Sequence, residues 1–168
     1  MSSSFLPPVT QDELEEKLSA GDEALLEFLA EPIHAELYAR QDFTFVDQLS
    51  EGQQLLISYD YVRMQVLQGG FIQFIQNGYI GILPPMPEWL NKAGATATAQ
   101  TIDDALKVYV LNRELLDKPT TTEEFAKLYD ELKEFELLDE QFSRQNDETV
   151  KAIAHYARTH ISDFVKVA

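Results

Sequence analysis

The sequence contains no cysteine, and this absence excludes several kinds of chemistry. Disulfide bonds, thiolate nucleophiles and zinc or iron-sulfur sites with cysteine ligands all require that residue. A chain without cysteine suits a reducing compartment, so we expect a cytoplasmic protein. The chain starts without the basic segment and long apolar run of a secretion signal, and residues 1–9 are predicted to form a disordered lead-in.

Basic residues are also scarce, with 13 Lys and Arg against 29 Asp and Glu, which gives a formal net charge of −16. Such a charge repels nucleic acid and anionic lipid, and it attracts basic protein surfaces. We therefore expect no direct binding of DNA, RNA or membranes, and a basic protein as partner. At 168 residues and 45% hydrophobic content the chain can still bury one sizeable core, so residues 10–168 are predicted to form a single domain.

Charged residues are missing altogether from Met64 to Pro87, which at first resembles a membrane segment. Glutamines, glycines and prolines interrupt this stretch, so it does not supply the ~20 predominantly apolar residues that a membrane helix needs. The stretch is instead predicted to be a buried pair of helices.

Helix start and stop signals predict an all-α fold, a single compact multi-helix domain. Capping-box spacing occurs at Thr10, Ser50 and Thr121, and Pro32 stands where a helix could begin. Residues 41–46 and 79–83 have weak strand character and are interpreted as loops. Helices are predicted near residues 10–20, 22–31, 32–40, 50–68, 70–77, 86–93, 97–116, 121–141 and 146–165.

Acidic residues are concentrated in two segments, which we call the first acidic arm (residues 1–48, net −9) and the second acidic arm (residues 103–148, net −8). In the first arm, Glu23, Glu27 and Glu31 are spaced by four, so on a helix they form one file with ~6 Å of rise between carboxylates. Like charges at this spacing destabilise a helix modestly, which indicates a use outside the fold. These three residues are predicted to bind a partner.

In the second arm, the predicted helix 121–141 has an apolar face opposite an acidic one. Glu123, Asp130 and Glu134 lie on the acidic face and are the other predicted partner-binding residues. A helix of 21 residues is ~31 Å long, close to the ~34 Å of one DNA turn. The apolar face of the same predicted helix comprises Phe125, Leu128, Leu132, Phe135 and Phe142. An alternative interpretation of the acidic face is that its charge is only solvated and serves solubility or a salty habitat.

The sequence offers no arrangement that carries catalysis. Glu31 and His34 have the spacing of one half of a di-iron site, but no second copy follows. His155 and His160 are five apart and so do not share a helix face. Calcium loops, phosphate-binding glycine loops and nucleophile elbows are absent from the sequence. We therefore expect no catalytic residues, no metal site, no cofactor and no enzymatic activity.

The central stretch carries a family signature. It reads Gln68-Gly69-Gly70-Phe71-Ile72-Gln73-Phe74-Ile75-Gln76-Asn77-Gly78, followed by Ala93-Gly94-Ala95. This resembles the Asn-Gly-Gly-Phe-x-Gln-aromatic-Phe-x-Asn signature of a bacterial family of small domains, with Gln68 and Ile75 as departures. Judged from the residues alone, the glycines can supply positive φ and close approach, and Phe71 and Phe74 are expected in the core. Gln73 and Asn77 lie four apart, where they could satisfy buried backbone groups or cap a helix end.

Within that family, the size and acidity of the chain resemble the nineteen-kilodalton DNA-mimic type. The resemblance implies an all-helical homodimer whose negative surface imitates duplex DNA. It implies as partner a basic, dimeric helix-turn-helix transcription factor, whose DNA-binding face the mimic occupies so that repression is relieved. The alternative hypothesis is a small-ligand-binding protein or enzyme that uses the region of Gln73 and Asn77.

Overall fold

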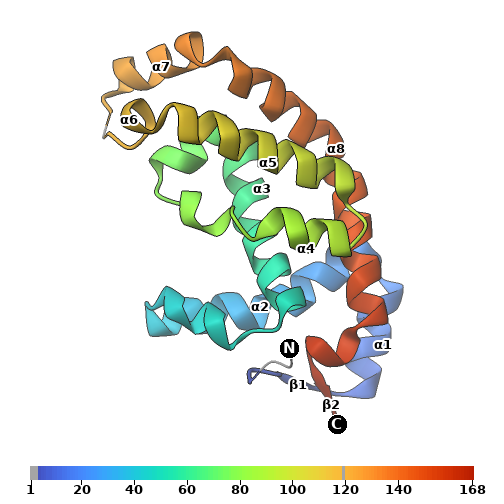
Figure 1. Cartoon of the computed structure of the whole chain (residues 1–168). Helices are drawn as coiled ribbons and strands as arrows, with labels where there is room; N and C mark the ends of the chain where they lie inside the picture. Colours follow the sequence, from blue (N-terminus) through green and yellow to red (C-terminus); the bar gives the residue numbers. More distant parts are fainter. Residues whose placement is uncertain (1–3, 119) are drawn as a thin grey trace. The chain divides into compact units, whose positions relative to one another are not determined.

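The computed structural model describes residues 4–118 and 120–168, which form an all-α fold as predicted (Figure 1). A short parallel pair of strands, β1 (Pro8–Val9) and β2 (Lys166–Val167), is the one exception within these residues. The loops predicted at residues 41–46 and 79–83 contain 3₁₀ turns, η1 (Phe43–Gln48) and η2 (Ile80–Ile82), and a third turn, η3 (Ile161–Asp163), precedes β2. The helices are α1 (Gln11–Ser19), α2 (Asp22–Arg40), α3 (Glu51–Gln76), α4 (Met86–Lys92), α5 (Thr96–Leu111), α6 (Arg113–Leu116), α7 (Thr122–Glu131) and α8 (Lys133–Thr159).

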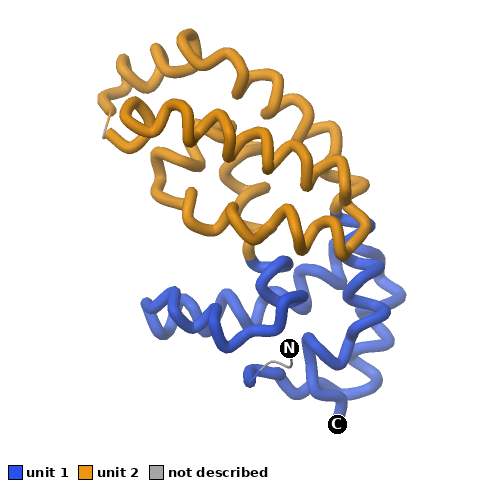
Figure 2. Tube along the Cα trace, in the orientation of Figure 1, with its two compact units in different colours: residues 1–57, 150–168 blue, residues 58–149 orange. Residues whose placement is uncertain are grey.

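The chain divides into two compact units (Figure 2). Unit 1 comprises residues 1–57 and 150–168, and unit 2 comprises residues 58–149. Unit 1 contains 13 acidic and 5 basic residues and unit 2 contains 16 and 8, so each carries a net charge of −8. The single domain predicted for residues 10–168 stays a prediction.

The three predicted capping boxes begin helices as expected. Thr10 and Ser50 each accept a hydrogen bond at 3.2 Å from the backbone N–H three residues later, and Thr121 does the same at the start of α7. At Ser50 the arrangement is buried, and the Gln53 side chain accepts a bond from the Ser50 N–H at 2.9 Å. These bonds satisfy N–H groups that have no partner within the helix, which explains why the sequence signal is reliable at these positions.

In unit 1, helices α1 and α2 pack against each other, and the two short strands join the ends of the chain. Pro8 pairs with Lys166 and Val9 with Val167, and Val9 is buried. The disordered lead-in predicted for residues 1–9 lies partly outside the described residues, but Pro8 and Val9 belong to this strand pair. Its pairing depends on residues almost at opposite ends of the sequence, so no local pattern indicates it.

Helix α2 runs through Pro32, so the prediction that a second helix begins there was wrong. An interior proline removes one backbone hydrogen bond and costs about 3 kcal/mol. Burial of apolar side chains on both sides of it, including Leu29 and Ile33, offsets this cost because each contributes roughly 1.5–3 kcal/mol. Helix packing thus overrides the local signal.

The core of unit 2 is rich in aromatic side chains. Phe71 and Phe74 are completely buried, as predicted. Phe71 lies 6.3 Å from Phe135 and 5.7 Å from Phe142 between ring centres, and so connects α3 with α8. The signature segment is therefore part of the core of unit 2.

The helix predicted over residues 121–141 is not continuous. Helix α7 ends at Glu131, Leu132 takes φ −110° and ψ 61°, and α8 then runs from Lys133 to Thr159. The ~31 Å acidic helix was therefore a wrong prediction, as was the separate helix at 146–165. The predicted apolar face is nevertheless on the inside, since Leu128, Leu132, Phe135 and Phe142 are all buried.

Candidate partner-binding surfaces and the glycine signature

The first acidic arm places its three predicted contact residues on one exposed helix. Glu23, Glu27 and Glu31 all lie in α2 with exposed side chains, so the predicted file is confirmed. Within residues 4–118 and 120–168, Glu27 and Glu31 form no ion pair. Their carboxylates are available to basic groups of another molecule, and their role in binding stays a prediction.

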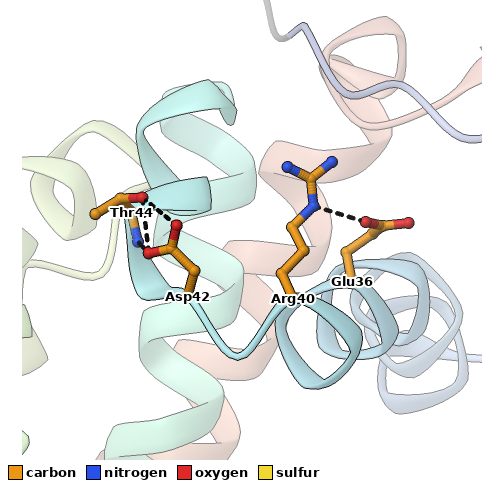
Figure 3. Close-up of polar contacts among 4 residues, drawn as sticks. All are labelled: Glu36, Arg40, Asp42 and Thr44. Carbon is orange, nitrogen blue, oxygen red and sulfur yellow. Dashed lines mark hydrogen bonds and ion pairs between the residues drawn. The ribbon is translucent and has the colours of Figure 1, made fainter.

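Two basic side chains of unit 1 pair with acids outside this file. Arg40 Nε donates to Glu36 Oε2 at 2.9 Å (Figure 3), and its guanidinium lies 4.5 Å from the centre of the Phe45 ring. Arg158 Nη1 donates to Asp22 Oδ1 at 2.6 Å. Both arginines are thus held within unit 1 by acids other than Glu27 and Glu31.

Asp42 is another acid of the first arm that serves the fold. Its carboxylate accepts hydrogen bonds from the backbone N–H of Thr44 at 3.0 Å and from the Thr44 hydroxyl at 2.8 Å (Figure 3). These bonds, the backbone one first, lower the pKa of Asp42 below its usual value. This carboxylate closes the turn between α2 and η1.

The second acidic arm divides its three predicted contact residues between two helices. Glu123 and Asp130 are exposed on α7, seven residues apart and thus ~10 Å along one face. Glu134 is exposed in the first turn of α8, so the shared face predicted for all three was wrong. None of the three forms an ion pair within the described part of the chain. Their role in binding stays a prediction.

The glycine signature lies at an interruption of α3. Gly70 has φ 84° and ψ 176°, which divides α3 into a long first part and a second part that begins at Phe71. A Cβ placed on Gly70 would lie 2.3 Å from Asp139 Oδ2 and 2.8 Å from Tyr129 Oη. Gly70 therefore provides both a positive φ and room for two polar side chains, as the sequence predicted for these glycines.

Asp139 and Tyr129 lie at the start of the second part of α3 and belong to two other helices. The Phe71 N–H donates to Asp139 Oδ1 at 2.8 Å, and the backbone of Gln73 lies close enough to the Tyr129 phenol to lower the pKa of that group. The Phe71 N–H belongs to the first turn of a helix, where no backbone acceptor is available within the helix. Asp139 on α8 thus satisfies the start of the second part of α3, and Tyr129 on α7 lies beside it. We call Gly70, Tyr129 and Asp139 the glycine clamp.

Burial perturbs both titrating groups of the glycine clamp. The net effect of burial, of the opposing hydrogen bond from Phe71 and of the nearby charge of Glu136 raises the pKa of Asp139 to about 6. Burial, followed by the charge of Asp139, raises the pKa of Tyr129 to about 12. Asp139 is therefore ionised at neutral pH although its surroundings favour the neutral form.

The polar side chains of the signature bond to one another. Gln73 Nε2 donates to Gln65 Oε1 at 3.2 Å and to Gln68 Oε1 at 3.1 Å, and Asn77 Nδ2 donates to Gln65 Oε1 at 2.7 Å. The sequence had suggested that the side chains of Gln73 and Asn77 satisfy buried backbone groups or cap a helix end. They bond to glutamine side chains instead. With Gln65 and Gln68 they form a partly exposed amide cluster on α3 and at Asn77, the residue that directly follows it.

The sequence analysis missed Asp139 and Tyr129. A signal for Asp139 was present, because it lies four residues after Phe135 and three before Phe142, on the apolar side of its helix. An acid at such a position needs a hydrogen-bonding partner in the interior. For Tyr129 there was no comparable signal, since tyrosine is common at the edge of an apolar face.

Comparison of the sequence with models of protein families gives a match that contains the glycine clamp. A family model described as DMP19-like protein matches residues 47–160, and a search of curated proteins found no match. The matched range contains the glycine clamp and the three predicted contact residues of the second acidic arm, but not Glu23, Glu27 or Glu31 of the first. Among the described residues, no group of three or more His, Asp or Glu side chains is placed to hold a metal ion. No helix in that part of the chain is both long and apolar enough to cross a membrane.

Proposed function

The chain belongs to the DMP19-like protein family, the family of the DNA-mimic proteins, and from this premise we propose that it acts as a DNA mimic. Its exposed carboxylates would bind the DNA-binding face of a transcription factor, a helix-turn-helix repressor, and block binding of DNA. The observation that carries the proposal is the family match, together with a net charge of −8 on each unit. Blocking a repressor in this way requires access to chromosomal DNA-binding proteins, which in bacteria lie in the cytoplasm.

The mechanism is electrostatic. Carboxylates take the place of phosphates as partners for Lys and Arg, so a face that binds DNA also binds the mimic. Opposite charges of this size speed the encounter, and added salt weakens it because exposed charges are screened over ~8 Å at physiological ionic strength. Affinity should therefore fall steeply with salt.

Charge density limits how the surface can be used. Duplex DNA carries one charge per ~1.7 Å of its axis, whereas a file of glutamates on one helix supplies one per ~6 Å. A single helix is therefore too sparse to replace a duplex, and several helices must contribute. Because the family match contains the second arm, we assign the main contact to Glu123, Asp130 and Glu134, with Glu23, Glu27 and Glu31 as further contacts.

We also propose that the chain acts as a homodimer, matched to a dimeric repressor. Large apolar side chains are exposed on unit 2, among them Leu111 at 83% and Val110 at 60%. Burial in a second copy would remove this surface from water at roughly 25 cal/mol for each Å². Sedimentation velocity of the purified chain tests the proposal, and a monomer at high concentration would contradict it.

One observation favours the second candidate, a ligand-binding protein or enzyme at the Gln73 region. Asp139, with its raised pKa, lies beside the start of the helix that carries Gln73, and perturbed titrating groups occur often at functional sites. Binding of small molecules would shift the amide resonances of Phe71 and Gln73 in an NMR titration against a metabolite set. Unchanged resonances would count against this candidate.

Affinity capture from a bacterial lysate tests the DNA-mimic proposal. The wild type is compared with a second-arm variant (Glu123→Gln, Asp130→Asn, Glu134→Gln) and a first-arm variant (Glu23→Gln, Glu27→Gln, Glu31→Gln). Each variant removes three charges from exposed helix positions, so the two variants have the same net charge and differ only in where the charges are removed.

We expect the wild type to retain a DNA-binding protein that duplex DNA and added salt release. The second-arm variant should retain much less of it, and the first-arm variant an intermediate amount. Capture of no protein that DNA can release would contradict the proposal. Equal capture by both variants would show that net charge, and not the second arm, attracts the partner.

A further inference from the structure

The break between α7 and α8 has no cause in the local sequence. Residues 121–159 contain neither glycine nor proline, and the residue at the break, Leu132, has a high helix propensity. Sharp interruptions of a helix usually occur at proline, at glycine or where another group inserts. A contact with another part of unit 2 must therefore hold this break.

The glycine clamp is a contact that needs the break. Tyr129 and Asp139 are ten residues apart, which on a continuous helix means ~15 Å of rise and a rotation of about 80° between the two side chains. Their terminal oxygens lie 2.8 Å and 2.3 Å from one point above Gly70, and are thus no farther apart than the sum of these distances, 5.1 Å. A straight helix would separate them.

The clamp also holds a hydrogen bond that would be lost with it. Asp139 accepts from the Phe71 N–H at 2.8 Å, at the start of the second part of α3. A buried N–H group left without a partner costs about 1–3 kcal/mol. Gly70 is buried and has no side chain, so the two oxygens can approach this turn closely.

We propose that Asp139 and Tyr129 are positioning residues that hold the α7–α8 break by clamping it to Gly70. The break in turn sets the positions of the acidic residues of the second arm. On a continuous helix Asp130 and Glu134, four apart, would stand next to each other in one file. The break places them on two different helices instead.

This last step rests on the proposed function, because it gives the break a role in partner binding. The raised pKa of Asp139 supports a functional role of the glycine clamp, since an asparagine could accept the Phe71 N–H without the cost of a buried charge. A residue that lowers stability where a neutral one would serve is typical of functional positions.

The absence of cysteine allows a direct distance measurement. Ala126→Cys on α7 and Ser143→Cys on α8 introduce two exposed sites for spin labels in a chain that has no other thiol. Pulsed electron paramagnetic resonance then reports the distance between the labels across the break. On a continuous helix the 17 intervening steps correspond to ~25 Å.

The clamp is removed by Asp139→Ala with Tyr129→Ala, and the matched control is Glu140→Ala with Glu131→Ala, which truncates exposed neighbours on the same two helices. We expect the clamp variant to shift the label distance toward that of a continuous helix, whereas the control keeps the wild-type distance. Asp139→Asn keeps an acceptor for the Phe71 N–H and should also keep the wild-type distance. If the clamp variant fails to fold, as judged by circular dichroism, Asp139→Ala and Tyr129→Phe are measured singly by the same criterion.

An unchanged distance in a folded clamp variant would overturn the positioning role, whatever the function of the chain. Partner capture supplies the second readout. A changed distance with capture reduced relative to the Glu140→Ala, Glu131→Ala control supports the role in binding, and a changed distance with unaltered capture overturns that role alone. If the wild type captures no DNA-binding protein, the proposed function fails while the distance still decides on the clamp.

Discussion

Replacing Gly70 by alanine tests the position of the signature at which a positive φ and close contacts to other helices coincide. At φ 84° and ψ 176° the backbone lies in a region that is essentially restricted to glycine, and an L-residue there costs roughly 1–3 kcal/mol. The new Cβ would also lie 2.3 Å from Asp139 Oδ2 and 2.8 Å from Tyr129 Oη, and relief of such overpacking costs about 1–3 kcal/mol. We expect Gly70→Ala to lower the free energy of unfolding by about 2–6 kcal/mol, a large part of the ~5–15 kcal/mol of a typical domain.

Gly78→Ala is a control that keeps a positive φ without the close contacts. Gly78 has nearly the same φ, 87°, but a Cβ there would meet no atom within 4 Å. The control should therefore lose only the conformational part, about 1–2 kcal/mol. Urea unfolding followed by circular dichroism measures both variants, and Asp139→Ala in the Gly70→Ala background should recover part of the loss. Equal destabilisation by Gly70→Ala and Gly78→Ala would refute the steric reasoning.

Three further predictions concern the described contacts. The pKa of Asp139 is raised in the fold from 3.8 to about 6, so its ionised form opposes folding and the resulting cost disappears as the pH falls through 6 toward 4. Because this group is partly exposed, we expect only a modest effect: as the pH falls from about 7 to 4.5, the wild type should gain ~1 kcal/mol in free energy of unfolding relative to Asp139→Asn. Urea unfolding measures both proteins, and a difference that does not change with pH would contradict this prediction. Gln53 is fully buried and donates to the carbonyls of Phe5 at 2.9 Å and Phe164 at 3.3 Å. Gln53→Met should therefore reduce stability by about 2–4 kcal/mol and lower the melting temperature more than Gln54→Met does. Thr121→Ala removes the N-cap of α7 and should speed hydrogen exchange in that helix, with ~1 kcal/mol of local stability lost, while exchange in α1 remains unchanged.

The sequence predicted best where a local rule decides the structure. The capping boxes at Thr10, Ser50 and Thr121 depend on residues three positions apart, and all three begin helices. The apolar face of the second arm was also read correctly, because Leu128, Phe135 and Phe142 are buried. Fold class and core followed from these patterns.

The sequence failed where distant residues decide. Helix α2 continues through Pro32 because both of its flanks are buried, and α7 ends at Glu131 in a stretch without helix breakers. The glycine clamp joins Gly70 to Asp139 across 69 positions, and only the acid's place on an apolar helix side indicated it. Contacts of this kind depend on packing that a single sequence does not display.

Competition with DNA on the isolated repressor is the most direct test of the central claim. The DNA-binding protein obtained by capture is bound to its fluorescently labelled duplex, and the chain is added while fluorescence anisotropy reports the bound DNA. The account predicts full displacement of DNA by the wild type, a weaker effect at higher salt, and a much higher concentration required of the Glu123→Gln, Asp130→Asn, Glu134→Gln variant than of the equally charged first-arm variant. Binding of the chain to the repressor without any displacement of DNA would contradict the claim that its acidic surface takes the place of DNA.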